Sequence, residues 1–223
     1  LMNSWSIVDY GDFPRARAVL EFLGDRQRPD GKIMHELTQS AALLDWSKYP
    51  YGYYHGDTTP LFLFSIAEYV TRSGDLEFLK ASWPAVDIAY RFCLGMLDDD
   101  GLMSNAKAGA GAVETGALSG KVAKDVYLAG AWLAGLDGYR RLAELAGRQA
   151  DSRDAAARLI HARQSMNAWS LPDKARLPFA RLTDGSLYDA QSSWQSFALA
   201  YGGLDEAPSR KAAAALARPE LAT

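Results

Sequence analysis

The stretch WSKYPYGYYHGDTTPLFLFSIAEY, residues 46–69, joins an aromatic loop to the first turns of an apolar helix. Its first half is rich in tyrosine and is interrupted by one proline and two glycines, which predicts a loop. Its second half predicts a helix start, because Asp57 offers an N-cap oxygen, Pro60 suits a first turn and an apolar run follows. We therefore expect Asp57 at the positive end of a helix dipole.

Aromatic rings next to a carboxylate are typical of a sugar site, because flat faces stack on C–H groups while the carboxylate accepts hydroxyl hydrogen bonds. A second interpretation stays open at this point. The tyrosines would then be anchors in the core, and Asp57 would only cap the helix. The motifs in the rest of the chain favour the interpretation as a sugar-binding site.

The composition is that of a globular protein without a nucleic-acid partner. The 223 residues are 48% hydrophobic and 23% charged. The 24 Lys and Arg residues against 27 Asp and Glu residues give a net charge of −3, and no run of basic residues is present that could neutralise the phosphates of a nucleic acid. No apolar run has membrane-spanning length, and we expect no membrane partner.

The cellular compartment stays open. The single cysteine, Cys93, lies in an apolar helical run and predicts a buried thiol, which fits a reducing compartment such as the cytoplasm. No secretory signal pattern stands at the start of the sequence. Leu1 is not an initiator methionine, so the sequence leaves open a longer natural chain.

Apolar spacing predicts a chain of helices with almost no strand signal. The expected helices cover residues 14–27, 58–72, 75–97, 124–146, 152–169, 190–201 and 208–218.

Two turn motifs recur along the chain and indicate a repeat of helical hairpins. Gly-Asp occurs at 11–12 and 74–75, and Asp-Gly occurs at 30–31, 100–101 and 184–185. We expect short glycine turns at one end and the long segments 28–57, 98–123 and 170–190 together on the opposite rim. An open solenoid is the alternative, but it would have tight connections on both sides.

The sequence therefore predicts an all-α fold, an (α/α)6 toroid of helical hairpins. Six hairpins need about twelve helices, so residues 1–223 are predicted to be one incomplete domain.

Four motifs on the long segments carry candidate chemistry. His35-Glu36 follows the first Asp-Gly turn, and Asp57 follows the aromatic loop. Glu114 is a single carboxylate among small residues, an apolar setting that raises a carboxyl pKa as a general acid requires; a solvated loop residue is the alternative. Tyr188–Trp194 is polar and aromatic, and its Asp189 is predicted to cap a helix.

Other classes of site lack support. The three histidines, His35, His55 and His161, do not have zinc-ligand spacing, although His35 and His55 could share one ion. The nucleophile motif G-x-S-x-G and the phosphate-binding G-x-x-x-x-G-K-[ST] are absent. We expect neither a metal nor an organic cofactor.

Three segments resemble a known family: GDFPRARAVLEFLGDRQRPDGKIMHE, YYHGDTTPLFLFSIAEYVTRSGDLEFLKASWPAVDIAYRF and DDDGLMSN. Their motifs D-G-K-I-x-H-E, aromatic-x-x-D-x-T-P-L-F and G-D-x-x-F-L…W-P are similar to those of glycogen-debranching, amylo-α-1,6-glucosidase-type enzymes. These belong to the six-hairpin glycosidase superfamily with (α/α)6 catalytic domains. The resemblance covers about residues 10–150.

The resemblance implies an inverting glycoside hydrolase acting on α-glucosidic linkages of an oligo- or polysaccharide. Asp57 corresponds to the family's sugar-binding aspartate, and Glu114 lies in the region of the general acid, without the tryptophan that usually precedes it. The family's general base and an upstream Arg-Asp motif have no match in this sequence. The remaining implied substrate-binding residues are Glu36, Trp46, Tyr53, Tyr54 and His55.

Two other functions stay open. The chain could be a non-catalytic carbohydrate-binding or scaffold protein built on the same hairpins. It could also be a lyase or isomerase, with His35 or His55 as the base.

Overall fold

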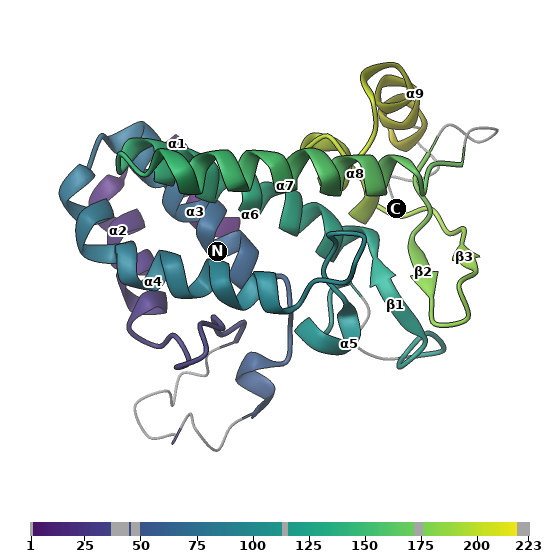
Figure 1. Ribbon diagram of the computed structural model, residues 1–223, viewed down its shortest axis with the longest axis horizontal. Coiled ribbons are helices and arrows are strands. Elements are labelled where there is room, and N and C mark those ends of the chain that lie inside the picture. The colour runs from purple at the N-terminus through teal and green to yellow at the C-terminus, as the bar shows by residue number, and fades with distance from the viewer. Residues whose placement is uncertain (1, 37–44, 46–49, 113–115, 172–175, 218–223) are drawn as a thin grey trace.

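The computed structural model describes residues 2–36, 45, 50–112, 116–171 and 176–217 (Figure 1). The helices are α1 (Met2–Asp9), α2 (Phe13–Gly24), the 3-10 helix η3 (Pro50–Tyr53), α3 (Thr58–Ser73), α4 (Leu76–Gly95), α5 (Asn105–Ala108), α6 (Val126–Leu145), α7 (Gln149–Asn167), α8 (Trp194–Ala200) and α9 (Glu206–Leu216). The strands are β1 (Val122–Asp125), β2 (Ala180–Leu182) and β3 (Leu187–Tyr188).

The long helices form hairpins that stand side by side. The described pairs are α1–α2, α3–α4, α6–α7 and α8–α9. The first helices of neighbouring pairs pack on one another, α1 on α3, α3 on α6 and α6 on α8. In Figure 1, α4 and α7 lie in front of α3 and α6, so the pairs make two layers. The predicted row of hairpins is confirmed for this part of the chain, whereas its closure into a toroid stays a prediction.

The recurring glycine turns join the two helices of a hairpin. Gly11 and Gly74 have left-handed backbone, with φ of 78° and 72°, which glycine adopts without a side-chain penalty. The aspartate after each glycine then caps the second helix: Asp12 accepts from Arg15 N, and Asp75 accepts from Phe78 N. The Gly-Asp pair therefore ends one helix and starts the next.

The three Asp-Gly turns share one local structure at the other end of the hairpins. In each, the aspartate accepts a hydrogen bond from the backbone N–H two residues later: Asp30 from Lys32 at 3.2 Å, Asp100 from Leu102 at 3.1 Å and Asp184 from Ser186 at 2.9 Å. The repeat predicted from sequence is thus a repeat of structure.

Small residues let α6 lie at the centre of the fold. A Cβ at Gly135 would stand 2.8 Å from the Pro60 backbone oxygen, and one at Gly138 would stand 2.8 Å from Phe64 Cα. On another face, a Cβ at Gly130 would stand 2.8 Å from the Ala198 backbone. These positions therefore bring α3 and α8 against the α6 backbone.

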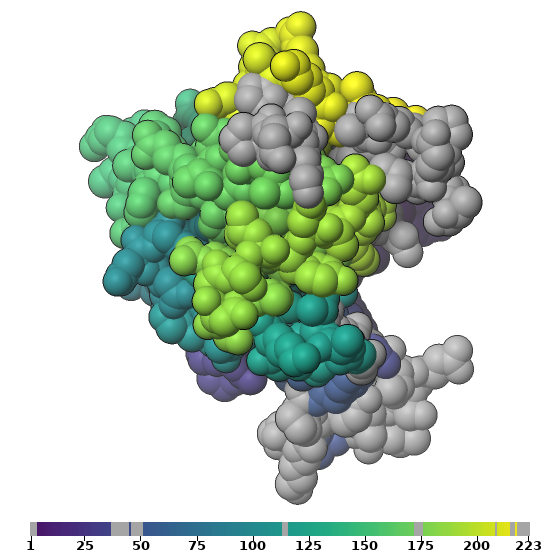
Figure 2. Space-filling view, turned by 90° about the vertical axis from the view of Figure 1, so that its right-hand side faces the viewer, coloured from purple at the N-terminus to yellow at the C-terminus, as the bar shows by residue number. Residues whose placement is uncertain are grey.

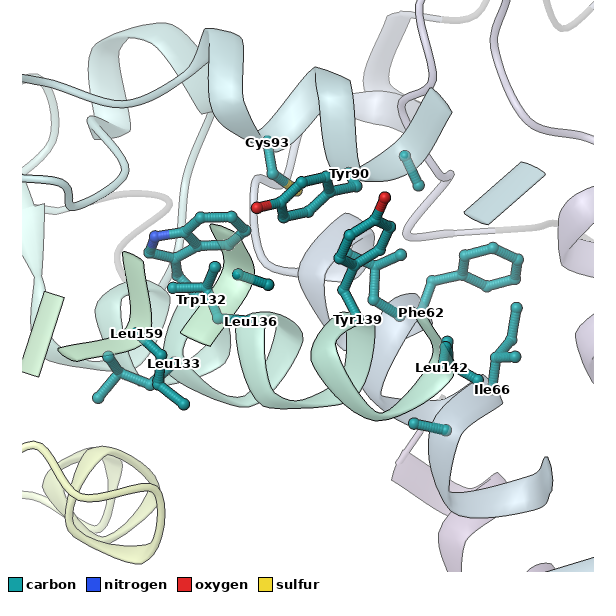
Figure 3. Close-up of a cluster of buried hydrophobic side chains, with 14 of the residues drawn as sticks. Phe62, Ile66, Tyr90, Cys93, Trp132, Leu133, Leu136, Tyr139, Leu142 and Leu159 are labelled. Atoms are coloured by element: carbon teal, nitrogen blue, oxygen red, sulfur yellow. The ribbon is translucent and has the colours of Figure 1, made fainter. Parts of the chain in front are cut away.

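Aromatic stacking fills the space between α4 and α6. The rings of Tyr90 and Tyr139 lie 3.7 Å apart and nearly parallel, and Trp132 lies beside Tyr90 (Figure 3). Cys93 is buried in the same cluster, as the sequence predicts, and burial raises its thiol pKa. This apolar layer supports the first turns of α6, where the candidate site begins.

The described parts of the long segments lie together at one end, as predicted. Gly56 N donates to Ala110 O, which joins the first segment to the second. Strand β1 pairs antiparallel with β2, and β2 with β3, which joins the second segment to the third. Figure 2 shows the second and third segments, teal and yellow-green, side by side on this face.

The secondary structure differs from the sequence predictions in three places. The chain does contain a small three-stranded sheet, because the strands are too short to show period-two alternation. Helices α1 and α5 were not predicted, and the helix predicted over 190–201 begins only at Trp194. None of the helices in the described ranges is long and apolar enough to cross a membrane.

The close approach of α6 to α3 is testable at Gly138. Gly138→Ala should lower the free energy of unfolding by about 1–3 kcal/mol, because the new methyl group meets the α3 backbone. Gly95→Ala is the matched control, since a Cβ there meets nothing within 4 Å. Chemical denaturation should show the control equal to the parent or more stable; equal loss in both variants would contradict the packing.

Candidate functional site

Asp57 stands at the N-cap position of α3 but does not use its side chain as a cap. Its Oδ2 accepts a hydrogen bond from the Tyr127 hydroxyl at 3.0 Å, and its Oδ1 lies 3.4 Å from His55 Nδ1. Oδ1 is buried and accepts no hydrogen bond from the residues described. The helix-cap interpretation of Asp57 therefore does not hold, because Tyr127 and His55, rather than the α3 backbone, contact its carboxylate.

Tyr127 reaches Asp57 from the first turn of α6, and sequence reasoning missed it. Its ring packs against Trp194 at 4.5 Å and Phe197 at 5.5 Å, both from α8. Burial, with Asp57 close by, raises the pKa of the Tyr127 hydroxyl, so it stays a proton donor at any ordinary pH. Tyr127 thus fixes the orientation of Asp57.

Two histidines lie side by side next to Asp57. The rings of His35 and His55 are 4.4 Å apart, and His35 also contacts Tyr51 at 5.2 Å. Burial, and then the neighbouring His55, lower the pKa of His35 below its usual 6.5. His35 is therefore neutral at pH 7, and its backbone N–H donates to Gly52 O at 2.8 Å.

The structure brings together some of the predicted substrate-binding residues. His55 and Tyr54 lie next to each other, with rings 5.7 Å apart, and Glu36 Oε2 lies 3.7 Å from His35 Nε2. Tyr53 points away, because its hydroxyl donates to Arg26 O at 2.7 Å and its side chain is in the core. Tyr53 is therefore not part of the cluster of Asp57, His55, His35, Tyr54 and Glu36, here called the Asp57 group.

Two predicted residues lie outside the described residues: Trp46 and the general acid Glu114. The chain just before Glu114 is held close to Asp57, however. Ala110 pairs with Tyr54 and Gly56, and Ala112 N donates to Asp125 Oδ2 at 3.2 Å.

Asp125 is a second carboxylate that sequence reasoning missed. It is fully buried at the N-cap of α6, where Oδ1 accepts from Leu128 N at 2.7 Å and Oδ2 from Asn105 Nδ2 at 2.7 Å. Burial raises the pKa of Asp125, while these hydrogen bonds act in the opposite direction. Asp125 binds the protein rather than a ligand. The aspartate ahead of the apolar run from Val126 is the N-cap signal that could have identified it.

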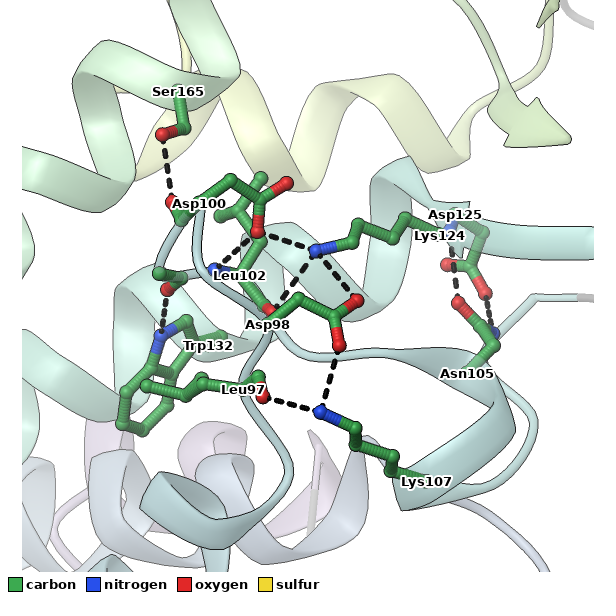
Figure 4. Close-up of polar contacts among 11 residues, drawn as sticks. Leu97, Asp98, Asp100, Leu102, Asn105, Lys107, Lys124, Asp125, Trp132 and Ser165 are labelled. Carbon is green, nitrogen blue, oxygen red and sulfur yellow. Dashed lines mark hydrogen bonds and ion pairs between the residues drawn. The ribbon is translucent and has the colours of Figure 1, made fainter. Parts of the chain in front are cut away.

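Lys124 holds strand β1 in place on the side opposite to Asp125 (Figure 4). Its buried ammonium pairs with Asp98 at 3.0 Å and with Asp100, and Lys107 pairs with Asp98 at 2.8 Å. Successive residues of a strand point to opposite sides, so Lys124 holds the Asp-Gly turn while Asp125 holds the loop at Ala112.

Asp189 has a different role from the predicted one. Ser193 stands at the N-cap of α8, whereas Asp189 pairs with Arg176 across the third segment. The prediction that Asp189 caps this helix is wrong, because α8 begins later than expected. Trp194 at the start of α8, which is 38% exposed, is the residue of that motif that reaches the Asp57 group.

A metal site finds no support in the described part of the chain, where no group of three His, Cys, Asp or Glu side chains is placed to hold an ion. The Asp57 group instead offers a carboxylate acceptor, neutral imidazole and exposed aromatic faces. That combination suits an uncharged ligand with many hydroxyls.

No protein-family model and no curated protein matches this sequence. Among solved structures, the chain is similar to a GH78 family rhamnosidase of Bacillus sp. GL1, with a TM-score of 0.64 and 22% sequence identity over 74% of this chain. The fold is mostly helical and resembles that of part of the rhamnosidase chain. The match covers 17% of the rhamnosidase chain, and at this identity the similarity is one of fold.

Lys32 lies beneath the site and should make stability depend on pH. Its buried ammonium donates to Ala108 O at 2.6 Å, and burial, followed by the charge of Arg28, lowers its pKa from 10.5 to about 8. The unfolded chain therefore binds more protons between about pH 8 and 10.5, so this group makes the free energy of unfolding rise with pH across that window.

Lys32→Met should remove this rise. Denaturation of the parent and the variant at steps from pH 7 to 10 should show the difference moving in favour of the parent above pH 8. Lys80→Met, on the exposed face of α4, is the control and should give a constant difference. A constant difference for Lys32→Met as well would contradict the buried charge.

Proposed function

We propose that this chain is part of the catalytic domain of a glycoside hydrolase that cleaves α-glucosidic linkages of an oligo- or polysaccharide by an inverting mechanism. The observation that carries the proposal is the Asp57 carboxylate. It stands at the start of α3, is spared from capping, is fixed by Tyr127 and lies beside aromatic rings on a glycoside hydrolase-like fold.

In this mechanism Asp57 holds the sugar whose bond is cleaved. Its Oδ1 accepts a sugar hydroxyl, while Tyr127 keeps Oδ2 in place. A charged hydrogen bond of this kind strengthens as the sugar ring distorts toward the transition state. His55 stands beside the same sugar, Glu36 and Trp46 complete this proposed subsite, and Tyr54, next to His55, contacts the rest of the substrate.

Glu114 is the proposed general acid. An inverting enzyme needs a protonated carboxyl beside the leaving oxygen and a base about 6.5–9.5 Å away that activates water. The hydrogen bond from Ala112 N to Asp125 and the pairing of Ala110 with Gly56 support this role, since they hold residues 110–112, close to Glu114 in sequence, next to the residue before Asp57. The family's general base has no matching residue in this sequence, so no residue is proposed for that role.

The sugar itself is proposed from the debranching-enzyme motifs around Asp57. The fold similarity to a rhamnosidase favours a second candidate, an α-rhamnoside. Hydrolysis of aryl α-glucosides and aryl α-rhamnosides by the intact protein separates the two. Binding without hydrolysis would indicate a carbohydrate-binding or scaffold protein, and an unsaturated product that absorbs ultraviolet light would indicate a lyase.

Asp57→Asn should weaken sugar binding about 10- to 100-fold, because a hydrogen bond to a charged acceptor contributes about 1.5–3 kcal/mol. Asp75→Asn is the matched control: Asp75 also precedes a helix and accepts a tyrosine hydroxyl, but it caps α4 at the far end of the hairpins. Calorimetric titration with maltooligosaccharides measures both variants. Equal affinity of Asp57→Asn and the parent would contradict the assigned role.

Glu114→Gln should reduce turnover of natural glucosides about 10²–10⁴-fold, because the leaving oxygen then departs without a proton. Glucosyl fluoride needs little protonation and should lose much less. Glu77→Gln, on the exposed side of α4, should change neither rate. Equal losses on both substrates would show that Glu114 is not the acid.

A further inference from the structure

Tyr51 and Tyr54 form a pair of stacked rings, here called the tyrosine shelf. Their rings are 5.8 Å apart and 16° from parallel. The cause is local: Tyr54 N donates to Tyr51 O at the end of η3, and in 3-10 geometry side chains three residues apart eclipse each other. Tyr53, between them in sequence, points into the core instead.

The backbone beneath the shelf is fixed from both sides. Gly52 O accepts from His35 N at 2.8 Å, and His35 Nδ1 lies 3.2 Å from the same oxygen. Ala110 N donates to Tyr54 O at 3.3 Å. A tyrosine side chain has only two torsions to restrict, so the shelf is largely pre-organised for a ligand.

The shelf leads directly to the Asp57 carboxylate. Tyr51 contacts His35 edge-on at 5.2 Å and Tyr54 contacts His55 edge-on at 5.7 Å, while His55 lies 3.4 Å from Asp57. Both tyrosines are 42% exposed even though they are large and apolar. An exposed aromatic pair next to an unsatisfied acceptor is typical of a ligand site rather than of a core.

The charges around the shelf favour an uncharged ligand. Among the described residues, the titratable groups nearest to it are the carboxylates of Asp57 and Glu36 and the imidazoles of His35 and His55, with the buried Lys32 ammonium behind the backbone. His35 is neutral at pH 7, because burial and the neighbouring His55 lower its pKa. A phosphate or an acidic sugar would therefore meet carboxylates here, whereas a neutral pyranose offers C–H groups to the rings and hydroxyls to the carboxylates.

We propose that the tyrosine shelf is a second sugar subsite: it binds the pyranose unit next to the one held by Asp57. The inference rests on the proposed carbohydrate function and adds that the ligand is recognised over at least two sugar units. Longer ligands therefore bind more tightly than a single sugar, and the shelf supplies the difference.

The test compares glucose, maltose and maltotriose by calorimetric titration of the intact protein, in a Glu114→Gln background so that the ligand is not consumed. Tyr51→Ala and Tyr54→Ala should each weaken maltose and maltotriose binding about tenfold and leave glucose binding unchanged. Tyr51→Phe and Tyr54→Phe keep the ring faces and should bind like the parent. Tyr188→Ala removes an equally exposed tyrosine from β3 and should change nothing.

Each other outcome has a distinct meaning. If the alanine variants melt like the parent and bind maltotriose as tightly, the shelf proposal fails and the Asp57 proposal stands. If they lose only phenyl glucoside binding, the shelf binds an aromatic leaving group and the second sugar subsite is refuted. If the parent binds none of the sugars, the proposed function fails, and the shelf proposal fails with it.

Discussion

The end of the molecule that carries Asp57 depends on the hydrogen bonds to the buried carboxylate of Asp125. It caps α6 through Leu128, holds Asn105 and accepts the N–H of Ala112, all without exposure to water. A buried charge is stable only when donors surround it. The requirement ties α5, the loop after it and the start of α6 to one point. A Cβ at Gly111 would stand 2.1 Å from Asp125 Oδ2, so the backbone approaches this carboxylate as closely as glycine allows.

Asp57 and Asp125 show how one sequence feature yields two roles. Both are aspartates at the start of a central helix, and both stand at the positive end of its dipole. Asp125 has extended backbone and turns its side chain onto the helix, whereas Asp57 already has helical φ and ψ, and Tyr127 holds its side chain away. The spared carboxylate faces the histidines and the tyrosine shelf.

The hairpin repeat could be predicted because its signals are local. Both turns depend only on residues close together in sequence. In one, a glycine with positive φ is followed by a capping aspartate; in the other, an aspartate accepts a hydrogen bond from the N–H two residues later. The helical spacing of apolar residues likewise predicts α3, α4 and α6 to within a few residues. The strands were not predicted, because two to four residues are too few to show the alternation of apolar and polar residues that indicates a strand.

The composition of the site could be predicted only in part, since contacts distant in sequence decide it. Nothing in the local sequence says that Tyr127, 70 residues from Asp57, orients it. The tyrosines at 51, 53 and 54 have similar neighbours in sequence, yet 3-10 geometry turns the first and last outward and the middle one into the core. The phase of the 3-10 turn, rather than residue type, separates the two exposed tyrosines from the one in the core.

The Asp57 carboxylate, which does not cap α3, is the proposed acceptor for a sugar hydroxyl. A crystal structure of the intact protein soaked with maltotriose tests this most directly. The account predicts a glucose unit with a hydroxyl donating to Asp57 Oδ1 and the Tyr127 hydroxyl still on Oδ2. A sugar bound elsewhere, or Asp57 turned to cap α3, would contradict it.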